Sequence, residues 1–169
     1  GDQSGIANNL INIGYVYTKK NEYTKAMECF QQSLQISEKI GNQKLLVLSL
    51  YSVGDVHFKL KQYKLARNFA LKCYTTAQDI GHLELKESGA KKLFEIDSAL
   101  GNWRSAFDYA RLYHHYADSL QNAAKAKEFG RHPRNRRIDR AVGDSEGVKS
   151  HHHPTPARIF ADSHHCVTS

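Results

Sequence analysis

The chain has 169 residues, which is room for one domain of ordinary size, and its formal net charge is +7 at pH 7. Its three cysteines are far apart and odd in number, which argues against a disulfide framework, and no apolar run approaches the roughly 18 residues that a membrane span needs. We identify no signal peptide and no initiator methionine, so we expect a piece of a longer protein. We expect a cytoplasmic location, or one that faces the cell envelope if the parent protein carries a signal peptide and a membrane span.

The most informative feature is a repeat of forty residues. Blocks 1–40, 41–80 and 81–120 align without a gap. The equivalent residues include Gly1, Gly41 and Gly81; Tyr23, Tyr63 and Trp103; and Ala26, Ala66 and Ala106. Each block contains two stretches with apolar residues at helical spacing, which predicts a pair of antiparallel helices. Because one pair cannot cover its own apolar face, the sequence predicts an all-α solenoid of stacked pairs.

Turn residues and small residues predict how these helices are joined and packed. Between the two helices of each block, one residue should adopt the left-handed conformation, for which lysine is a poorer choice than glycine or asparagine. In block order, these residues are Asn21, Lys61 and Gly101. Gly14 and Gly54 on the first helices should face the alanines of the second helices, so that the helices approach closely. The large aromatic residues that flank the alanines are expected to fill the wedge between neighbouring pairs.

The register of these residues resembles that of the tetratricopeptide repeat, in its forty-residue variety. The residues of the first block that carry the resemblance are Leu10, Ile13, Gly14, Tyr17, Ala26 and Phe30. The second block keeps Leu50, Val53, Gly54 and Ala66, and the third keeps Leu93 and Ala106. The resemblance covers about residues 1–120. It implies a right-handed α-solenoid, with a concave groove that the first helix of each pair lines.

The period ends at Gln121, where a fourth block would begin with glycine. Asp118 can cap a new helix, with Gln121 as the reciprocal half of a capping box, so residues 118–130 are predicted to form a capping helix over the open end of the stack. A repeat array that closes in DSLQNAAKAKEFGR resembles the input region of certain bacterial signalling proteins. The acidic and basic heptads that follow in those proteins are absent after Arg131.

Residues 131–169 are predicted to form a disordered tail, since they hold all three prolines, few apolar residues and no helical period. Its stretch RHPRNRRIDR holds five arginines, a composition that also occurs in nucleic-acid-binding arms. We favour a simpler explanation: the tail is either solvated or not native coding sequence. Its histidines match no zinc signature, so incidental chelation is the preferred interpretation.

No catalytic constellation or cofactor motif stands out. There is no glycine-rich phosphate loop, and nothing places a serine, a histidine and an aspartate together. His114 and Asp118 lie one helical turn apart, which is at most half of a metal site and more often a solvated helix face. Cys73 takes a small-residue position that packing explains. We therefore expect no enzyme, cofactor, metal or small-molecule substrate.

The groove remains as the candidate site. It should present carboxamides that pair with a peptide backbone, tyrosines that offer flat contact area, and lysines that attract carboxylates. The expected residues are Asn8, Asn12, Tyr15, Lys19, Tyr51, Asp55, Phe58, Lys59, Lys91, Lys92, Glu95 and Ser98. By resemblance, Asn12 is the asparagine that holds ligand backbone in related repeats.

The predicted function is non-catalytic binding of a peptide or partner domain, in the input or scaffolding region of a bacterial signalling protein. Two alternatives stay open. The chain could be a fragment of a histidine kinase or nucleotide cyclase whose catalytic part is missing, or it could bind nucleic acid through its arginine-rich tail. The apolar end of so short a stack also leaves a homodimer open.

Overall fold

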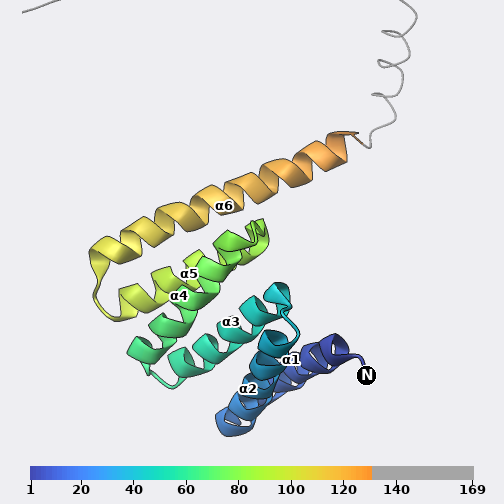
Figure 1. Ribbon diagram of the computed structural model, residues 1–169. Coiled ribbons are helices and arrows are strands. Elements are labelled where there is room, and N and C mark those ends of the chain that lie inside the picture. The colour runs from blue at the N-terminus through green and yellow to red at the C-terminus, as the bar shows by residue number, and fades with distance from the viewer. Residues whose placement is uncertain (131–169) are drawn as a thin grey trace, which may run out of the picture. The chain divides into compact units, whose positions relative to one another are not determined.

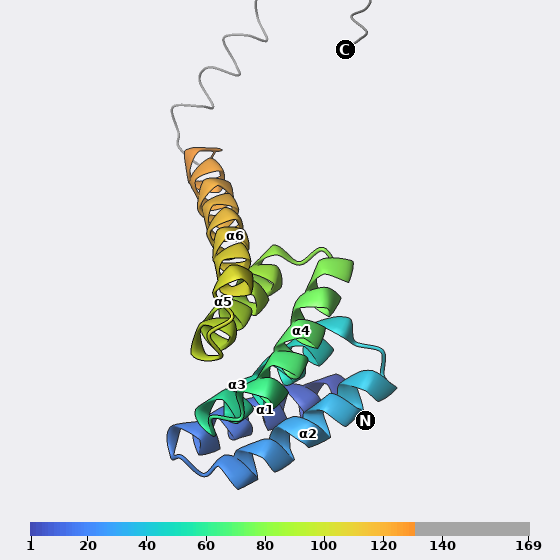
Figure 2. The same ribbon diagram turned by 90° about the vertical axis from the view of Figure 1, so that its left-hand side faces the viewer.

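The computed structural model describes residues 1–130, whereas residues 131–169, where the sequence predicts the basic and histidine-rich tail, lie outside the described part. Residues 1–130 contain six α-helices and no strand (Figure 1). In chain order, the helices are α1 (Gln3–Lys19), α2 (Tyr23–Lys39), α3 (Gln43–Lys59), α4 (Tyr63–Asp79), α5 (Leu83–Ala99) and α6 (Trp103–Gly130). Consecutive helices run antiparallel and stack, with α1 and α2 at one end and α6 at the other (Figures 1 and 2). The all-α solenoid predicted from the repeat is confirmed.

Each turn between helices contains one residue in the left-handed conformation. The φ angles are 61° at Asn21, 67° at Gly41, 59° at Lys61, 70° at Gly81 and 75° at Gly101. The prediction for the turns inside the repeats is therefore confirmed. Glycine adopts this conformation freely, whereas a lysine side chain makes it cost roughly 1 kcal/mol. The structure thus places backbone strain at Lys61, in the middle repeat.

The second helices α2 and α4 hold the stack together because each contacts two first helices. α2 packs on α1 and α3, and α4 packs on α3 and α5. The alanines at the equivalent repeat positions, Ala26, Ala66 and Ala106, are all buried. Gly14 and Gly54 are buried too, but their neighbours differ. The Phe30 ring packs directly on Gly14, whereas Gly54 lies close to the backbone of Ala66 and Ala70.

The first helices lie on the inner side of the stack. α3 contacts both α1 and α5, whereas no comparable packing joins α2 to α4 within residues 1–130. A stack whose first helices touch and whose second helices diverge curves toward the first helices. We call the solvent-facing side of α1, α3 and α5 the inner face.

The expectation of a separate capping helix over residues 118–130 is wrong. α6 continues without a break from Trp103 to Gly130. The physical reason is local: Gln121 replaces the glycine that ends the second helix at Gly41 and Gly81, and the residues that follow are good helix formers. Residues 121–127 are exposed, so this part of α6 does not cover the end of the stack.

The wedge predicted for Trp103 is also wrong. Tyr23 and Tyr63 are half-buried. Tyr23 packs against a hydrophobic cluster of α1, α2 and α3, and Tyr63 packs against one of α4 and α5. Trp103 at the same repeat position is 71% exposed. In the first two repeats the following helix helps to cover the aromatic ring, and no helix follows α6 within the described residues.

Candidate functional site

The inner face brings part of the predicted groove together as one cluster. The Nζ atom of Lys92 lies 2.9 Å from Asp55 Oδ1 and 2.8 Å from Glu95 Oε2. The same nitrogen lies 5.5 Å from the centroid of the Tyr51 ring and 5.1 Å from that of the Phe58 ring. Lys59 approaches Asp55 at 3.9 Å. This cluster joins α3 to α5.

Lys92 is committed to the fold rather than free for a ligand. Its side chain is buried, and two carboxylates neutralise it. Burial by itself would lower the pKa of Lys92, but the hydrogen bonds to Glu95 and Asp55 outweigh that effect and raise the pKa, so the ammonium stays charged. The expectation that this lysine attracts a partner's carboxylate therefore does not fit the geometry.

A second contact of the same kind joins α1 to α3. The hydroxyl groups of Tyr15 and Ser52 are hydrogen-bonded at 2.9 Å. Tyr15 and Asp55 share one repeat position, and Ser52 and Lys92 share another. The first helices are thus connected twice by the same pair of repeat positions, through different chemistry. Asn12 occupies the position of Ser52 and Lys92 in the first repeat, and there the side chain is exposed.

The remaining predicted groove residues do not join this cluster. Asn8, Asn12 and Lys19 are exposed along α1, and Ser98 is half-buried on α5. Lys91 points toward α6, where its Nζ atom lies 5.8 Å from the centroid of the Tyr113 ring. The inner face is therefore polar and open on α1 and largely self-paired between α3 and α5.

Sequence reasoning missed an apolar pocket of about 220 Å³ that opens between the two tyrosines of the inner face. Its lining residues come from α1, α3, α4 and α5 and are Tyr15, Val47, Leu48, Tyr51, Cys73, Leu85 and Ser88. One signal was available: Asn8, Leu48 and Ser88 share a repeat position. That position changes from polar in α1 to apolar in α3, which indicates an apolar site in the middle of the inner face.

The ionisable side chains that line the pocket, Tyr15, Tyr51 and Cys73, are held in their neutral forms. Burial raises the pKa of the Cys73 thiol to about 12, so the thiol stays protonated at neutral pH. Burial is also the main cause that raises the pKa of Tyr15 and of Tyr51, so both phenols stay neutral. The pocket therefore offers apolar surface and neutral hydroxyl groups.

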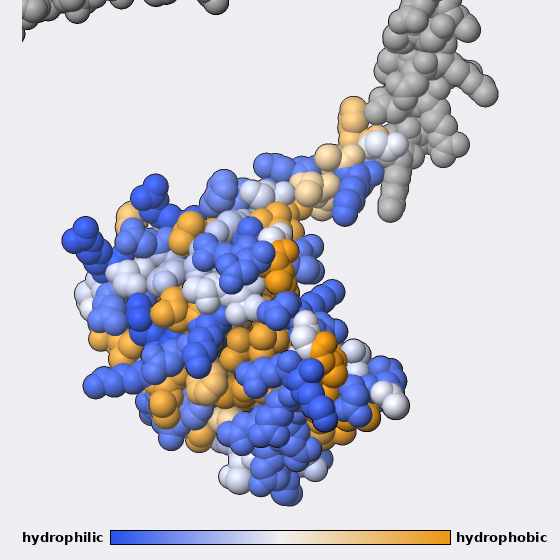
Figure 3. Space-filling view, in the orientation of Figure 1, coloured by the Kyte–Doolittle hydropathy of each residue, from blue (hydrophilic) through white to orange (hydrophobic). Residues whose placement is uncertain are grey.

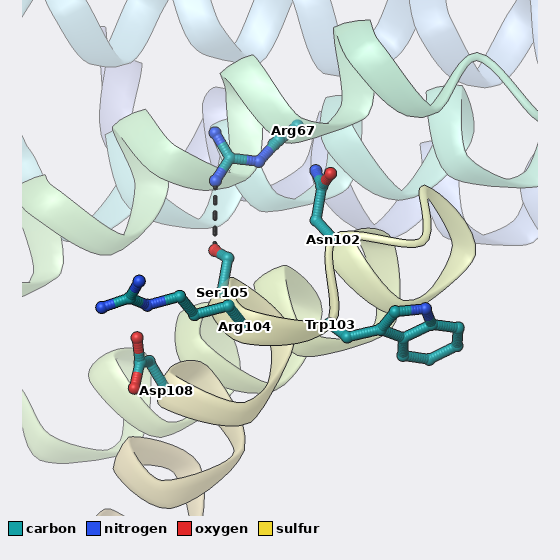
Figure 4. A pocket seen from close by; sticks show the side chains of 6 residues that line it. All are labelled: Arg67, Asn102, Trp103, Arg104, Ser105 and Asp108. Atoms are coloured by element: carbon teal, nitrogen blue, oxygen red, sulfur yellow. Dashed lines mark hydrogen bonds between the residues drawn. The ribbon is translucent and has the colours of Figure 1, made fainter.

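A larger depression of about 610 Å³ lies where α4 meets the start of α6 (Figure 4). Its lining residues are Arg67, Asn102, Trp103, Arg104, Ser105 and Asp108. In Figure 4, Ser105 points toward Arg67, whereas Trp103 points away from it. The polar contacts beneath this depression stabilise the fold, because Arg67 Nε donates a hydrogen bond of 2.6 Å to the fully buried carboxylate of Asp97.

Asp97 holds three helices in place. Besides Arg67 of α4, its carboxylate accepts hydrogen bonds from the Ser105 hydroxyl at 2.6 Å and from the Asn102 side chain at 3.2 Å. Burial alone would raise the pKa of Asp97, but these donors outweigh it and lower the pKa. Arg67 is therefore already paired, and we do not assign the depression to a ligand.

Two further observations concern metal-binding groups and membrane-spanning helices in the described part of the chain. His114 and Asp118 gain no third ligand there, and residues 1–130 hold no group of three histidine, cysteine, aspartate or glutamate side chains placed to bind a metal ion. None of their helices combines the length and the apolarity that crossing a bilayer requires. On the face drawn in Figure 3, hydrophobic residues are interspersed with hydrophilic ones.

Comparisons with known proteins agree with this architecture. Residues 5–79 match the family model of the tetratricopeptide repeat. Among solved structures, the chain is similar to the crystal structure of the TPR domain of Arabidopsis FLU, with a TM-score of 0.60 and 12% sequence identity. The match covers 71% of this chain and 98% of that one, and at this identity it bears on the fold alone. No curated protein sequence matches the chain.

Proposed function

Because this chain is a tetratricopeptide repeat protein, we propose that the inner face of its stack binds an extended segment of a partner protein. Repeats of this family mediate protein–protein interaction and are typically non-catalytic. The observation that carries the finer proposal is the apolar pocket between Tyr15 and Tyr51, beside a row of exposed carboxamides on α1.

The size of the pocket favours a single side chain as its occupant. At about 220 Å³, it is smaller than the roughly 300–1,000 Å³ typical of small-molecule sites. An aliphatic side chain of the partner, such as leucine or methionine, would bury its apolar surface there. Full burial of such a side chain contributes about 1.5–3 kcal/mol. The pocket would thus supply the anchor of the interaction.

The backbone of the partner segment would run along α1. Asn8 and Asn12 lie about one turn apart, and Asn12 precedes Tyr15 by three residues, so all three share one side of the helix. Carboxamides both donate and accept hydrogen bonds, which suits the alternating groups of an extended backbone. Lys19 is exposed and is available to an acidic residue that flanks the anchor.

A peptide selection tests this proposal. The full chain would be used to select binders from a random peptide library, and selected peptides should share an aliphatic residue. The variant Ser88→Phe fills the pocket and should weaken their binding at least tenfold. Its control is Ser119→Phe on α6, since each of these serine hydroxyls donates to the carbonyl oxygen four residues earlier. Selected peptides that bind the Ser88→Phe variant as well as the unaltered chain would contradict the proposal.

The wider role that we propose is that of an input or scaffolding region in a bacterial signalling protein. The support is the resemblance of residues 118–131 to the segment that closes such arrays. The sequence of the parent reading frame tests this directly. An output domain after the array would support the proposal, and a parent protein with no such domain would overturn it.

A further inference from the structure

One side of α1 exposes residues that the other repeats bury. Ile13 is 47% exposed and Val16 is 52% exposed. The residues at the same repeat positions in α3 and α5 are Val53, Val56, Leu93 and Ile96, and each is at most 1% exposed. The first repeat therefore presents a face of α1 that the fold elsewhere buries completely. We call this face, with Ile13 and Val16, the α1 end face.

The fold itself shows what covers this face. In the middle repeat, α2 covers it: Ala26 and Phe30 share a buried cluster with Val53 and Val56. In the third repeat, α4 covers it: Ala66, Ala70 and Tyr74 of α4 share a buried cluster with Ala90, Leu93 and Ile96 of α5. In both cases the covering helix is the second helix of the preceding repeat. It makes the contact with its outward side, which is the side that points toward the next repeat.

Within residues 1–130, no helix covers the outward side of α6, which is the second helix of the third repeat. Trp103 and the neighbouring Phe107, which is 64% exposed, occupy the repeat positions of Tyr23 and Met27. Tyr23 and Met27 both pack against the buried cluster that also includes Val53 and Val56 of the next repeat. We call the side of α6 with Trp103 and Phe107 the α6 end face. The two end faces lie at opposite ends of the stack (Figure 1).

We propose that copies of this chain associate end to end, with the α6 end face of one copy packed on the α1 end face of the next, as α2 packs on α3. The two surfaces are the two halves of an interface that the chain already makes twice within itself. No charged residue lies in α1 between Gln3 and Thr18, which is unusual for an exposed helix. Covering this part of α1 therefore desolvates no charge on α1 itself.

The geometry of this contact determines the kind of assembly. Each copy uses two different surfaces, so the contact is heterologous and leaves one free end face at either end of a pair. Association should therefore depend on concentration and continue past the dimer. The inner face takes no part in the contact, so this inference stands apart from the peptide-binding proposal.

Sedimentation velocity of the full chain over a range of concentrations tests the inference. The mean mass should rise with concentration. Ile13→Glu blocks the α1 end face and Phe107→Glu blocks the α6 end face, so each variant alone should remain monomeric. An equimolar mixture should form dimers and nothing larger, because each variant retains the surface that the other lacks.

Controls make the result specific. Leu65→Glu introduces the same charge on α4, at a leucine that is 47% exposed, and should leave association unchanged. Circular dichroism checks that each variant folds. Three outcomes would overturn the inference: a monomer at every concentration, a Phe107→Glu variant that associates as the unaltered chain does, or a mixture that stays monomeric.

Discussion

Replacing Gly14 by alanine should destabilise the fold, whereas the same replacement at Gly54 should not. The two glycines occupy one repeat position but have different neighbours. A Cβ atom added at Gly14 would lie 2.7 Å from two carbons of the buried Phe30 ring, well inside contact distance. At Gly54 the nearest atom, Phe69 Cβ, would lie 3.4 Å away, which is an ordinary contact.

The magnitude follows from two opposing effects. Alanine in a helix interior is about 1 kcal/mol more favourable than glycine, and this gain applies to both sites. Overpacking a core costs roughly 1–3 kcal/mol, and this cost applies only at Gly14, where the Phe30 ring must move although its edge also meets the Tyr15 ring. We therefore expect Gly54→Ala to stabilise by about 0.5–1 kcal/mol. Gly14→Ala should be less stable than Gly54→Ala by about 1–3 kcal/mol.

Urea unfolding followed by circular dichroism measures both free energies of unfolding. The two variants serve as controls for each other, because both glycines lie on first helices at the same repeat position and undergo the same chemical change. Equal stability of the two variants would refute the reasoning. It would mean that the Phe30 ring moves at no cost, and that the close packing seen at Gly14 does not constrain the first repeat.

Two further sites give predictions that urea unfolding can check. Lys61→Gly should stabilise the chain by about 0.5–1 kcal/mol, because glycine adopts the φ angle of 59° without strain; a loss of stability would contradict this. Asp97→Asn should lower the free energy of unfolding by about 2–3 kcal/mol. This is a small loss for a broken buried ion pair, because the Arg67 side chain is 32% exposed and can be hydrated. The folded-state pKa of Asp97 is lowered, so its stabilisation should be fully present above the unfolded pKa of about 3.9 and be lost as pH falls further through the folded pKa. The Asp97→Asn variant should therefore lose less stability on acidification than the unaltered chain, and parallel pH profiles would contradict this.

The sequence by itself determined the features that depend on local energies. Helical periodicity and the recurrence of Ala26 every forty residues predicted the pairs and their stacking, because these patterns report which side of each helix must be buried. The left-handed turns at Asn21 and Gly101 followed from residue preference alone. Even the strained turn at Lys61 was predictable, since its place in the repeat left it no other conformation.

Only the tertiary structure decided which side chains meet across the stack. Lys92 looked like a free cation of the groove, but the offset between α3 and α5 places it on Asp55, 37 residues earlier in the chain. The packing of α1, α3, α4 and α5 also opens the pocket beside Tyr15, and the packing of α4 on α5 buries Asp97 against Arg67. Such pairings depend on the small rotation from one helix pair to the next. That rotation arises from the packing of all side chains between the helices, so no single repeat specifies it.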